Sequence, residues 1–192
     1  MPKFFTMLSR MGAVAVIFFA LPLPINHEII LPIPVAEAAQ PLQFPTAGAS
    51  KPASISIPSI KLNSNIVPMG LLKNGDLDVP SGKTNLIGWY AAGTTPGELG
   101  SAVLDAHVYA AFKNLRNVKV GQDVYVTMDS GATLHFKITQ KKTLPLASIS
   151  ADEFYNDASG KNLHLITCAG TFIKSLNTYD HRLLVYATLV EN

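Results

Sequence analysis

The pattern of apolar and polar positions after residue 53 is typical of short β-strands. Ser54–Ile57 alternates polar and apolar side chains, which is the period of a half-buried strand, and Pro58 ends or edges it. Further short apolar or alternating runs predict more strands: Leu86–Tyr90, Ala102–Tyr109, Val124–Val126, Leu134–Ile138, Leu163–Cys168 and Leu183–Val190. Helical periodicity is almost absent, so we expect an all-β domain.

Turn residues separate these runs. Asn-Gly within Lys73–Asp76 tolerates the positive φ of a tight hairpin, and Asp129–Ala132 lies between two predicted strands. Within the longer connection Thr143–Gly160, Ser150–Glu153 has the form of a capping box and predicts a short helix, and Ala110–Leu115 predicts one helical turn. About eight strands with two hairpins indicate an antiparallel barrel or sandwich with one or two short helices.

The N-terminal segment has the features of an export signal. Lys3 and Arg10 precede the apolar run Met11–Leu21, and the next charged residue is Glu28. The small-x-small form of Ala36–Ala38 favours cleavage. However, this site lies far from the apolar run, so a signal retained as a membrane anchor stays open. In either case we expect the rest of the chain to work outside the cytoplasmic membrane.

Composition divides the chain into three parts. It has 192 residues, of which 48% are hydrophobic, enough for one domain with a buried core. An Ala-, Pro-, Gly- and Ser-rich stretch after the leader indicates a linker. We therefore predict a signal or anchor over residues 1–38, a linker over 39–53 and a single domain over 54–192.

Charge and motifs exclude several functions. The net charge is +2 and the charges are interspersed, so no nucleic-acid-binding surface is expected. The sequence contains no glycine-rich phosphate loop and no His/Cys cluster with metal spacing. Asp152, Glu153 and Asp157 are spaced along a connection, where such carboxylates are usually solvated. We therefore predict no cofactor and no metal.

Cys168 is the one cysteine of the chain, so it cannot form an internal disulfide. Exported proteins mostly use cysteines in pairs. A single thiol indicates a partner chain or a reactive group, but many free cysteines are small buried apolar residues. The cysteine count by itself favours neither interpretation.

The positions of three polar residues favour a reactive thiol. Cys168 ends an apolar run and is followed by Ala169 and Gly170, which would place the thiol at the rim of a sheet. His107 ends another apolar run, and Arg182 opens the last one. Polar residues at the ends of three apolar strands can converge at one end of a barrel.

The other candidates have simpler interpretations. His27 lies in the leader or linker, His135 alternates with apolar neighbours toward solvent, and His164 lies early in its strand. His181 adjoins Arg182 but faces the opposite side of a regular strand. Arg116 is interpreted as a surface residue.

Several segments resemble the sortase family, in particular the compact members often grouped as class F. The similarity runs from about Ser54 to Leu189, and its most specific part is Leu165–Cys168 followed 14 positions later by Arg182. The segments that carry it are Ile55–Ile60, Pro96–Leu104, Phe112–Leu115, Val120–Asp123, Leu165–Cys168 and Arg182–Ala187. One departure is Ala106, where the family usually has glycine before its histidine.

The resemblance implies an eight-stranded sortase β-barrel and a cysteine transpeptidase. Cys168 would form a thioester with the substrate, His107 would protonate the leaving amine, and Arg182 would bind the oxyanion or the substrate backbone. Thr167 would support the site, and the methyl group of Ala106 would slightly crowd the substrate groove.

The resemblance also implies partners and a location. The substrates would be surface proteins with a Leu-Pro-any-Thr-Gly-like sorting signal, and the acceptor a peptidoglycan precursor or another amine of a Gram-positive cell wall. An anchored N-terminal segment is somewhat favoured, which would place the domain at the outer face of the membrane or in the wall. Two alternatives stay open: a cysteine peptidase on the same scaffold with water as acceptor, and a non-catalytic envelope binding module with a buried Cys168.

Overall fold

The computed structural model describes residues 50–150, 152–155 and 159–191. The predicted leader, 1–38, and most of the predicted linker, 39–53, lie outside these residues. The first strand begins at Pro52, two residues before the predicted start of the domain. A search of the described helices for one that is long and apolar enough to cross a membrane found none.

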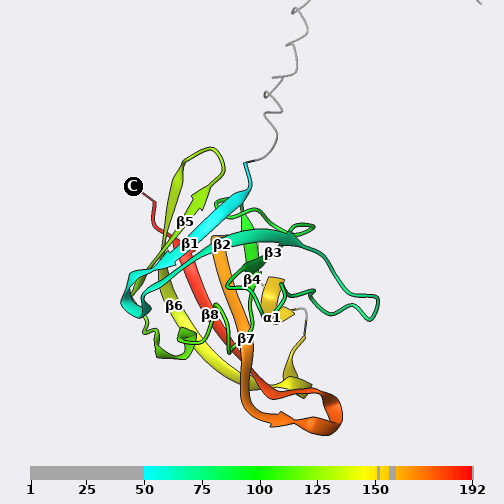
Figure 1. Cartoon of the computed structure of the whole chain (residues 1–192). Coiled ribbons are helices and arrows are strands. Elements are labelled where there is room, and N and C mark those ends of the chain that lie inside the picture. Colours follow the sequence, from blue (N-terminus) through cyan, green and yellow to red (C-terminus); the bar gives the residue numbers. More distant parts are fainter. Residues whose placement is uncertain (1–49, 151, 156–158, 192) are drawn as a thin grey trace, which may run out of the picture. The chain divides into compact units, whose positions relative to one another are not determined.

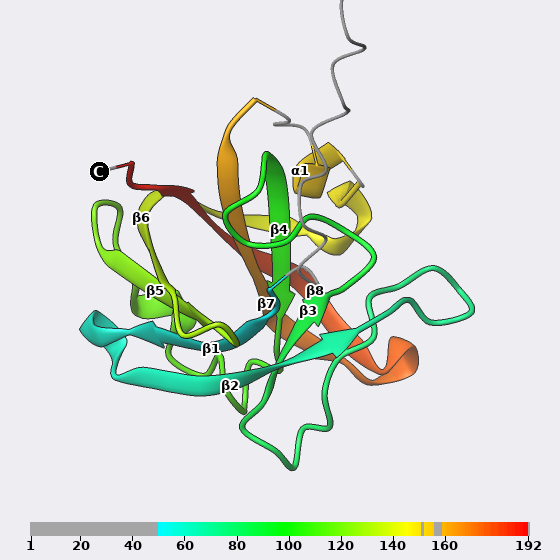
Figure 2. The same cartoon turned by 90° about the horizontal axis from the view of Figure 1, so that it is seen from above.

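Eight strands form a closed barrel, which confirms the predicted all-β fold (Figures 1 and 2). The strands are β1 (Pro52–Ile57), β2 (Leu62–Met69), β3 (Ile87–Tyr90), β4 (Gly100–Asp105), β5 (Asp123–Met128), β6 (Thr133–Pro145), β7 (Lys161–Ile173) and β8 (Thr178–Leu189). Their order around the barrel is β1-β2-β3-β4-β7-β8-β6-β5, and β5 closes the ring on β1. The α-helix of the described chain, α1 (Asp152–Tyr155), lies where the capping box predicts a short helix.

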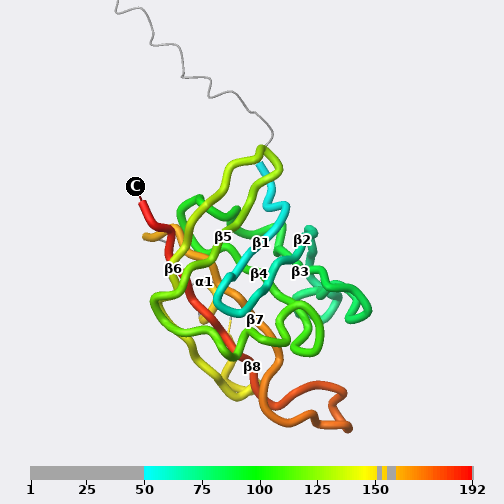
Figure 3. The backbone as a smooth tube through the Cα atoms, turned by 60° about the vertical axis from the view of Figure 1, so that its left-hand side comes forward, coloured from blue at the N-terminus to red at the C-terminus, as the bar shows by residue number. Residues whose placement is uncertain are grey.

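The sequence analysis expected an antiparallel sheet, but the barrel also contains parallel strand pairs. β2 pairs with β3 in parallel, and so does β4 with β7. A parallel pair requires a crossover, because both strands must start at the same end of the sheet. Residues 70–86 provide the first crossover, and β5 and β6 with their connections provide the second (Figure 3).

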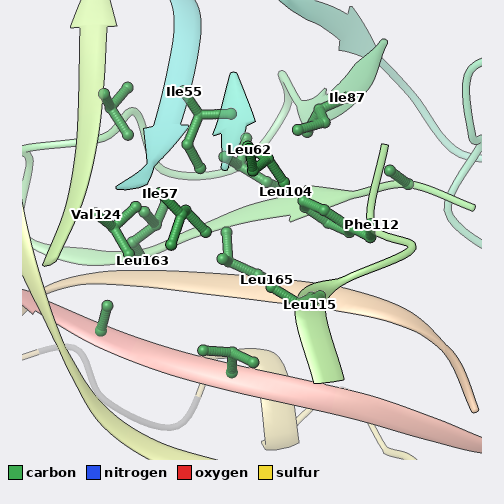
Figure 4. Close-up of a cluster of buried hydrophobic side chains, with 14 of the residues drawn as sticks. Ile55, Ile57, Leu62, Ile87, Leu104, Phe112, Leu115, Val124, Leu163 and Leu165 are labelled. Atoms are coloured by element: carbon green, nitrogen blue, oxygen red, sulfur yellow. The ribbon is translucent and has the colours of Figure 1, made fainter. Parts of the chain in front are cut away.

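The core consists of inward-facing residues at alternate positions of the strands (Figure 4). Ile55 and Ile57 of β1 illustrate the pattern, and Leu163 and Leu165 of β7 repeat it on the other side of the barrel. Phe112 and Leu115, from the β4–β5 connection, close one part of this core and are fully buried. The period-2 pattern found in the sequence is therefore the inner face of the barrel.

One of the two predicted hairpins is fully formed. Asp129–Ala132 joins β5 to β6 with Gly131 at a φ of 86°, which glycine adopts without strain. The chain also turns at Lys73–Asp76, but only the single bridge Leu71↔Leu77 forms there. This turn therefore belongs to an extended loop of the β2–β3 connection.

Strand boundaries near the candidate residues differ from the prediction. β4 ends at Asp105, so His107 lies just beyond the strand. β7 continues five residues past Cys168, and Arg182 is the fifth residue of β8 rather than its first. The apolar runs stop where the strands leave the barrel, because the projecting β7–β8 hairpin has little core to cover (Figure 1).

Leu165→Ala tests how much the stability of the barrel depends on the buried face of β7. Leu165 is 0% exposed and pairs with Leu104 across β4 and β7. We expect the variant to lose about 2–5 kcal/mol of unfolding free energy, because the cavity adds to the lost burial. Leu176→Ala is the control, since Leu176 is 64% exposed in the hairpin. Equal urea midpoints for the two variants would contradict the assignment of the core.

Candidate active site

The candidate residues form one row, with Cys168 on β7, Arg182 on β8 and His107 just beyond the end of β4. Cys168 of β7 and Arg182 of β8 are direct partners in an antiparallel pair. On the other side of β7, Asp105 is the parallel partner of Ile166 in the last pair of that ladder, and His107 and Cys168 each lie two residues further along their segments. One backbone contact continues past β4, because the Ala106 N–H donates to the Ile166 carbonyl at 3.3 Å. The three predicted residues therefore lie on neighbouring segments of the barrel.

These three side chains share the face of the sheet that points away from the core. Inward positions on the same strands are occupied by core residues such as Leu165 on β7 and Leu183 on β8. Because strand side chains alternate, Cys168 and Arg182 project to the opposite face. Cys168, Arg182 and His107 are each partly exposed. A thiol, a guanidinium and an imidazole are therefore accessible on one surface.

Thr167 links the segments that precede the thiol and the imidazole. Its Oγ1 donates a buried hydrogen bond of 2.7 Å to the carbonyl of Ala106. The side chain thus points away from Cys168, as the strand period requires. The sequence analysis expected the methyl group of Ala106 to crowd the substrate groove slightly. Ala106 is instead 4% exposed and its methyl group packs in the core, away from the outer face.

The backbone turns sharply after His107. The His107 carbonyl accepts hydrogen bonds from the N–H groups of Ala110 at 3.1 Å and Phe112 at 3.3 Å. The predicted helical turn at Ala110–Leu115 is replaced by these turns and a 3₁₀ segment at Leu115–Asn117. The imidazole of His107 stacks on the ring of Tyr109, with centroids 4.9 Å apart and planes inclined by 15°.

Arg182 is held by the start of its own strand. Its Nη1 donates to the carbonyls of Tyr179 and His181, both at 3.0 Å, and its Nη2 donates to Thr178 Oγ1 at 3.1 Å. These three bonds use three of the five N–H groups of a guanidinium. The two remaining N–H groups suit an oxygen acceptor of a bound peptide.

A bulge next to the row sets the direction of the hairpin. Gly170 has a φ of 78°, and the β7–β8 register shifts between Ala169 and Phe172. Asp180 accepts from the Thr171 N–H and contacts His181 Nδ1, both at 2.7 Å. The contact with His181 has the largest effect and the bond from Thr171 the next, and together they hold the pKa of the Asp180 carboxyl below its ordinary value. His181 is thereby paired with Asp180 rather than aimed at the thiol.

The remaining predicted positions serve the scaffold. His135 contacts Asp123 at 2.8 Å, and buried His164 packs edge-on against Tyr186. Glu153 of α1 accepts from the Tyr186 hydroxyl at 2.8 Å, which lowers the pKa of Glu153 and ties the helix to β8. Asp157 lies outside the described residues. Within those that are described, no group of three His, Cys, Asp or Glu side chains is arranged to hold a metal.

Sequence analysis missed Asp105, a buried carboxyl two residues before His107. It is 8% exposed and faces Gly88 of β3, where an added Cβ would lie 2.5 Å from its Oδ1. Burial raises the pKa of Asp105 to about 7, and the negative charge of Asp78 adds to the rise. The sequence did contain one signal for this buried carboxyl, namely an acidic residue inside the apolar run Ala102–Val108.

Comparisons with known proteins agree with the fold. The profile of the Sortase domain matches residues 55–190. The fold is similar to that of a Clostridium perfringens sortase D5 transpeptidase, with 18% identity, a TM-score of 0.56, and coverage of 73% of this chain and 79% of that chain. A comparison with curated proteins found no match.

Two other solved structures are more similar in sequence. Sortase A from Corynebacterium diphtheriae is 25% identical, with a TM-score of 0.55 over 74% of this chain and 61% of that chain, so the match spans less than two thirds of its length. Sortase C-1 from Actinomyces oris is 25% identical, with a TM-score of 0.56 over 73% of this chain and 72% of that chain. These names represent several sortase classes, so the resemblance to class F stays a prediction.

Asp105→Asn tests the buried carboxyl. Because the folded-state pKa is above that of an unfolded aspartate, about 3.9, the fold favours the protonated form. Wild type should therefore lose stability relative to the variant as the pH rises from about 4 to about 7, by on the order of 4 kcal/mol in full. Denaturant unfolding at about pH 4.5 and at about pH 8 measures the difference.

Asp123→Asn is the contrasting variant. Hydrogen bonds from Lys137 and His135 hold the pKa of Asp123 below its ordinary value, so its contribution is present above the unfolded pKa and is lost on acidification. A pH trend of the same sign in both variants would contradict the assignment for Asp105.

Proposed function

The chain belongs to the sortase family of cysteine transpeptidases, and we propose that it cleaves a Leu-Pro-any-Thr-Gly-like sorting signal and transfers the acyl part through a Cys168 thioester to a cell-wall amine. The observation that carries this proposal is the row formed by Cys168 on β7, Arg182 on β8 and His107 just beyond the end of β4. The row offers a nucleophile, a proton donor and a cation on one exposed face.

In the first half-reaction, the Cys168 thiolate attacks the carbonyl carbon of the scissile peptide bond. The thiolate, not the thiol, is the nucleophilic form of a cysteine. The C–N bond then breaks, the C–S bond of the thioester remains, and His107 gives its proton to the leaving amine. His107 is neutral at the end of this step.

The second half-reaction reverses these roles. The acceptor amine attacks the thioester carbonyl and gives a proton to His107, a new C–N bond forms, and the C–S bond breaks to restore the thiolate. The bonds and protons of the two half-reactions balance without an oxidant, a metal or a nucleotide. Water in place of the amine would give hydrolysis by the same steps.

We assign Arg182 to the developing oxyanion or the substrate backbone. Its contacts with Thr178, Tyr179 and His181 fix the guanidinium at the start of β8, the strand that pairs with β7, before a substrate binds. Preorganised donors lower the cost of charge development, because they need not reorient during the reaction. Thr167 supports this arrangement through its bond to the carbonyl of Ala106.

The proposed partners follow from this reaction. The substrates are exported surface proteins that carry the sorting signal, and the acceptor is a peptidoglycan precursor or another wall amine. Members of this family work outside the cytoplasm or at the membrane, and we propose that residues 1–38 export this chain and retain it there.

A sorting peptide incubated with and without a glycine oligomer tests the transfer reaction. We expect a ligated product only with the oligomer, and no product from Cys168→Ala or His107→Ala. His181→Ala is the matched control, because His181 is paired with Asp180 and should retain most activity. Mass spectrometry of the products measures each outcome.

Two results would contradict this proposal. Free acid as the sole product, even at high oligomer concentration, would indicate a cysteine peptidase. No cleavage of any member of a sorting-peptide library, together with no effect of thiol alkylation, would indicate a binding module.

Arg182→Lys tests whether the fork of the guanidinium is needed. A lysine keeps the charge but places all of its donors on one nitrogen, so it cannot reproduce the planar fork that contacts the start of β8 from two nitrogens. We expect kcat to fall about 10²-fold, the usual cost of losing one oxyanion donor. Arg116→Lys is the control, because Arg116 is exposed in the Leu115–Asn117 segment. An Arg182→Lys enzyme as active as this control would exclude the assigned role.

A further inference from the structure

Tyr109 is an exposed aromatic residue with one specific neighbour. Its ring is stacked on the imidazole of His107, with centroids 4.9 Å apart and planes within 15° of parallel. Its side chain is nonetheless 62% exposed, so burial of apolar surface does not explain its position. Stacked aromatic pairs contribute energy beyond the area that they bury.

Gly82 lies against the hydroxyl end of the Tyr109 ring. It belongs to the β2–β3 connection, and a Cβ added there would be nearest to the Tyr109 hydroxyl oxygen, then 2.7 Å from Cε2 and 2.9 Å from Cζ. Tyr109 therefore contacts the His107 imidazole through its ring face and the backbone at Gly82 through its hydroxyl end.

The imidazole needs such a support. His107 lies beyond the end of β4, and its carbonyl, not its ring, is fixed by the N–H groups of Ala110 and Phe112. Among the side-chain hydrogen bonds of residues 50–150, 152–155 and 159–191, none fixes the ring of His107. Acid–base residues that act with a nucleophile are generally oriented by a third group. Tyr109 is in position to serve as that group through its ring face.

We propose that Tyr109 is a positioning residue for His107 and that Gly82 keeps it in place. This inference rests on the proposed function, because it assumes that His107 transfers the proton. Tyr109 acts through the imidazole and not on the substrate. Its loss should therefore slow the chemical step without weakening peptide binding.

Tyr109→Ala in the full-length chain tests this proposal. We expect kcat for the sorting peptide to fall about 3- to 10-fold, the equivalent of one stacking interaction, while KM stays unchanged. Tyr109→Phe should keep nearly full activity, because the ring remains. Tyr125→Ala is the matched control, since Tyr125 stacks on His135 with the same centroid distance, 4.9 Å, and an angle of 18°.

Gly82→Ala tests the same stack from the hydroxyl end of the Tyr109 ring. Gly82 is not among the glycines with positive φ, so alanine fits its backbone but displaces the Tyr109 ring. We expect the kcat loss of Tyr109→Ala, and no further loss in the double variant. Gly93→Ala is the control, because its Cβ would meet a different ring, Tyr90, at 2.8 Å.

Proton NMR gives a readout that is independent of turnover. Stacking shifts the imidazole proton resonances upfield, so the His107 signal should move downfield in Tyr109→Ala and Gly82→Ala but not in Tyr109→Phe. The His135 signal should move in the same way in Tyr125→Ala, which shows that the measurement detects this geometry.

Three outcomes would overturn the inference: full kcat in Tyr109→Ala, a rise in KM alone, or an unchanged His107 signal. The first would show that the ring is not needed, the second that Tyr109 is a substrate contact, and the third that the stack is absent in solution. Failure of the proposed function is distinct, because the unmodified chain would then form no ligated product.

Discussion

The site depends on the way in which β7 is paired, because its two neighbouring strands run in opposite directions to each other. β7 runs parallel to β4 on one side and antiparallel to β8 on the other. A change of one residue in either register would turn the neighbour's side chains to the other face. The thiol, the imidazole and the guanidinium therefore meet only because both registers hold. The bond from Thr167 to Ala106 reinforces the β4 side, where the regular strand has already ended.

The sequence analysis predicted the all-β fold for a definable reason. A closed barrel has one inner face, so each strand carries the same alternation of core residues that the sequence shows. The apolar run that ended at Cys168 marked the rim of the barrel and not the end of β7, whereas the run that ended at His107 passed the end of β4 at Asp105. Beyond the rim, β7 and β8 remain paired but face solvent, so hydrophobic pattern does not reveal their length.

Contacts between distant segments were beyond prediction from one sequence. Asp78, in the β2–β3 connection, acts electrostatically on the buried Asp105, and Gly82 of the same connection lies against Tyr109. Both depend on the path of residues 70–86, in which the Asn-Gly turn predicted a hairpin but formed only one bridge. Local turn chemistry specifies the bend, whereas packing against the rest of the chain decides where the loop lies.

Closure of the sheet has a consequence for motion. Each strand is hydrogen-bonded to two others, so no strand of the barrel can separate without breaking two ladders. Local opening is therefore confined to elements outside this ring, such as the projecting β7–β8 hairpin, which has few buried contacts. The His107–Cys168–Arg182 row lies where the ring meets the hairpin. One side of the site is thus as rigid as the whole domain, while the other can fluctuate on its own.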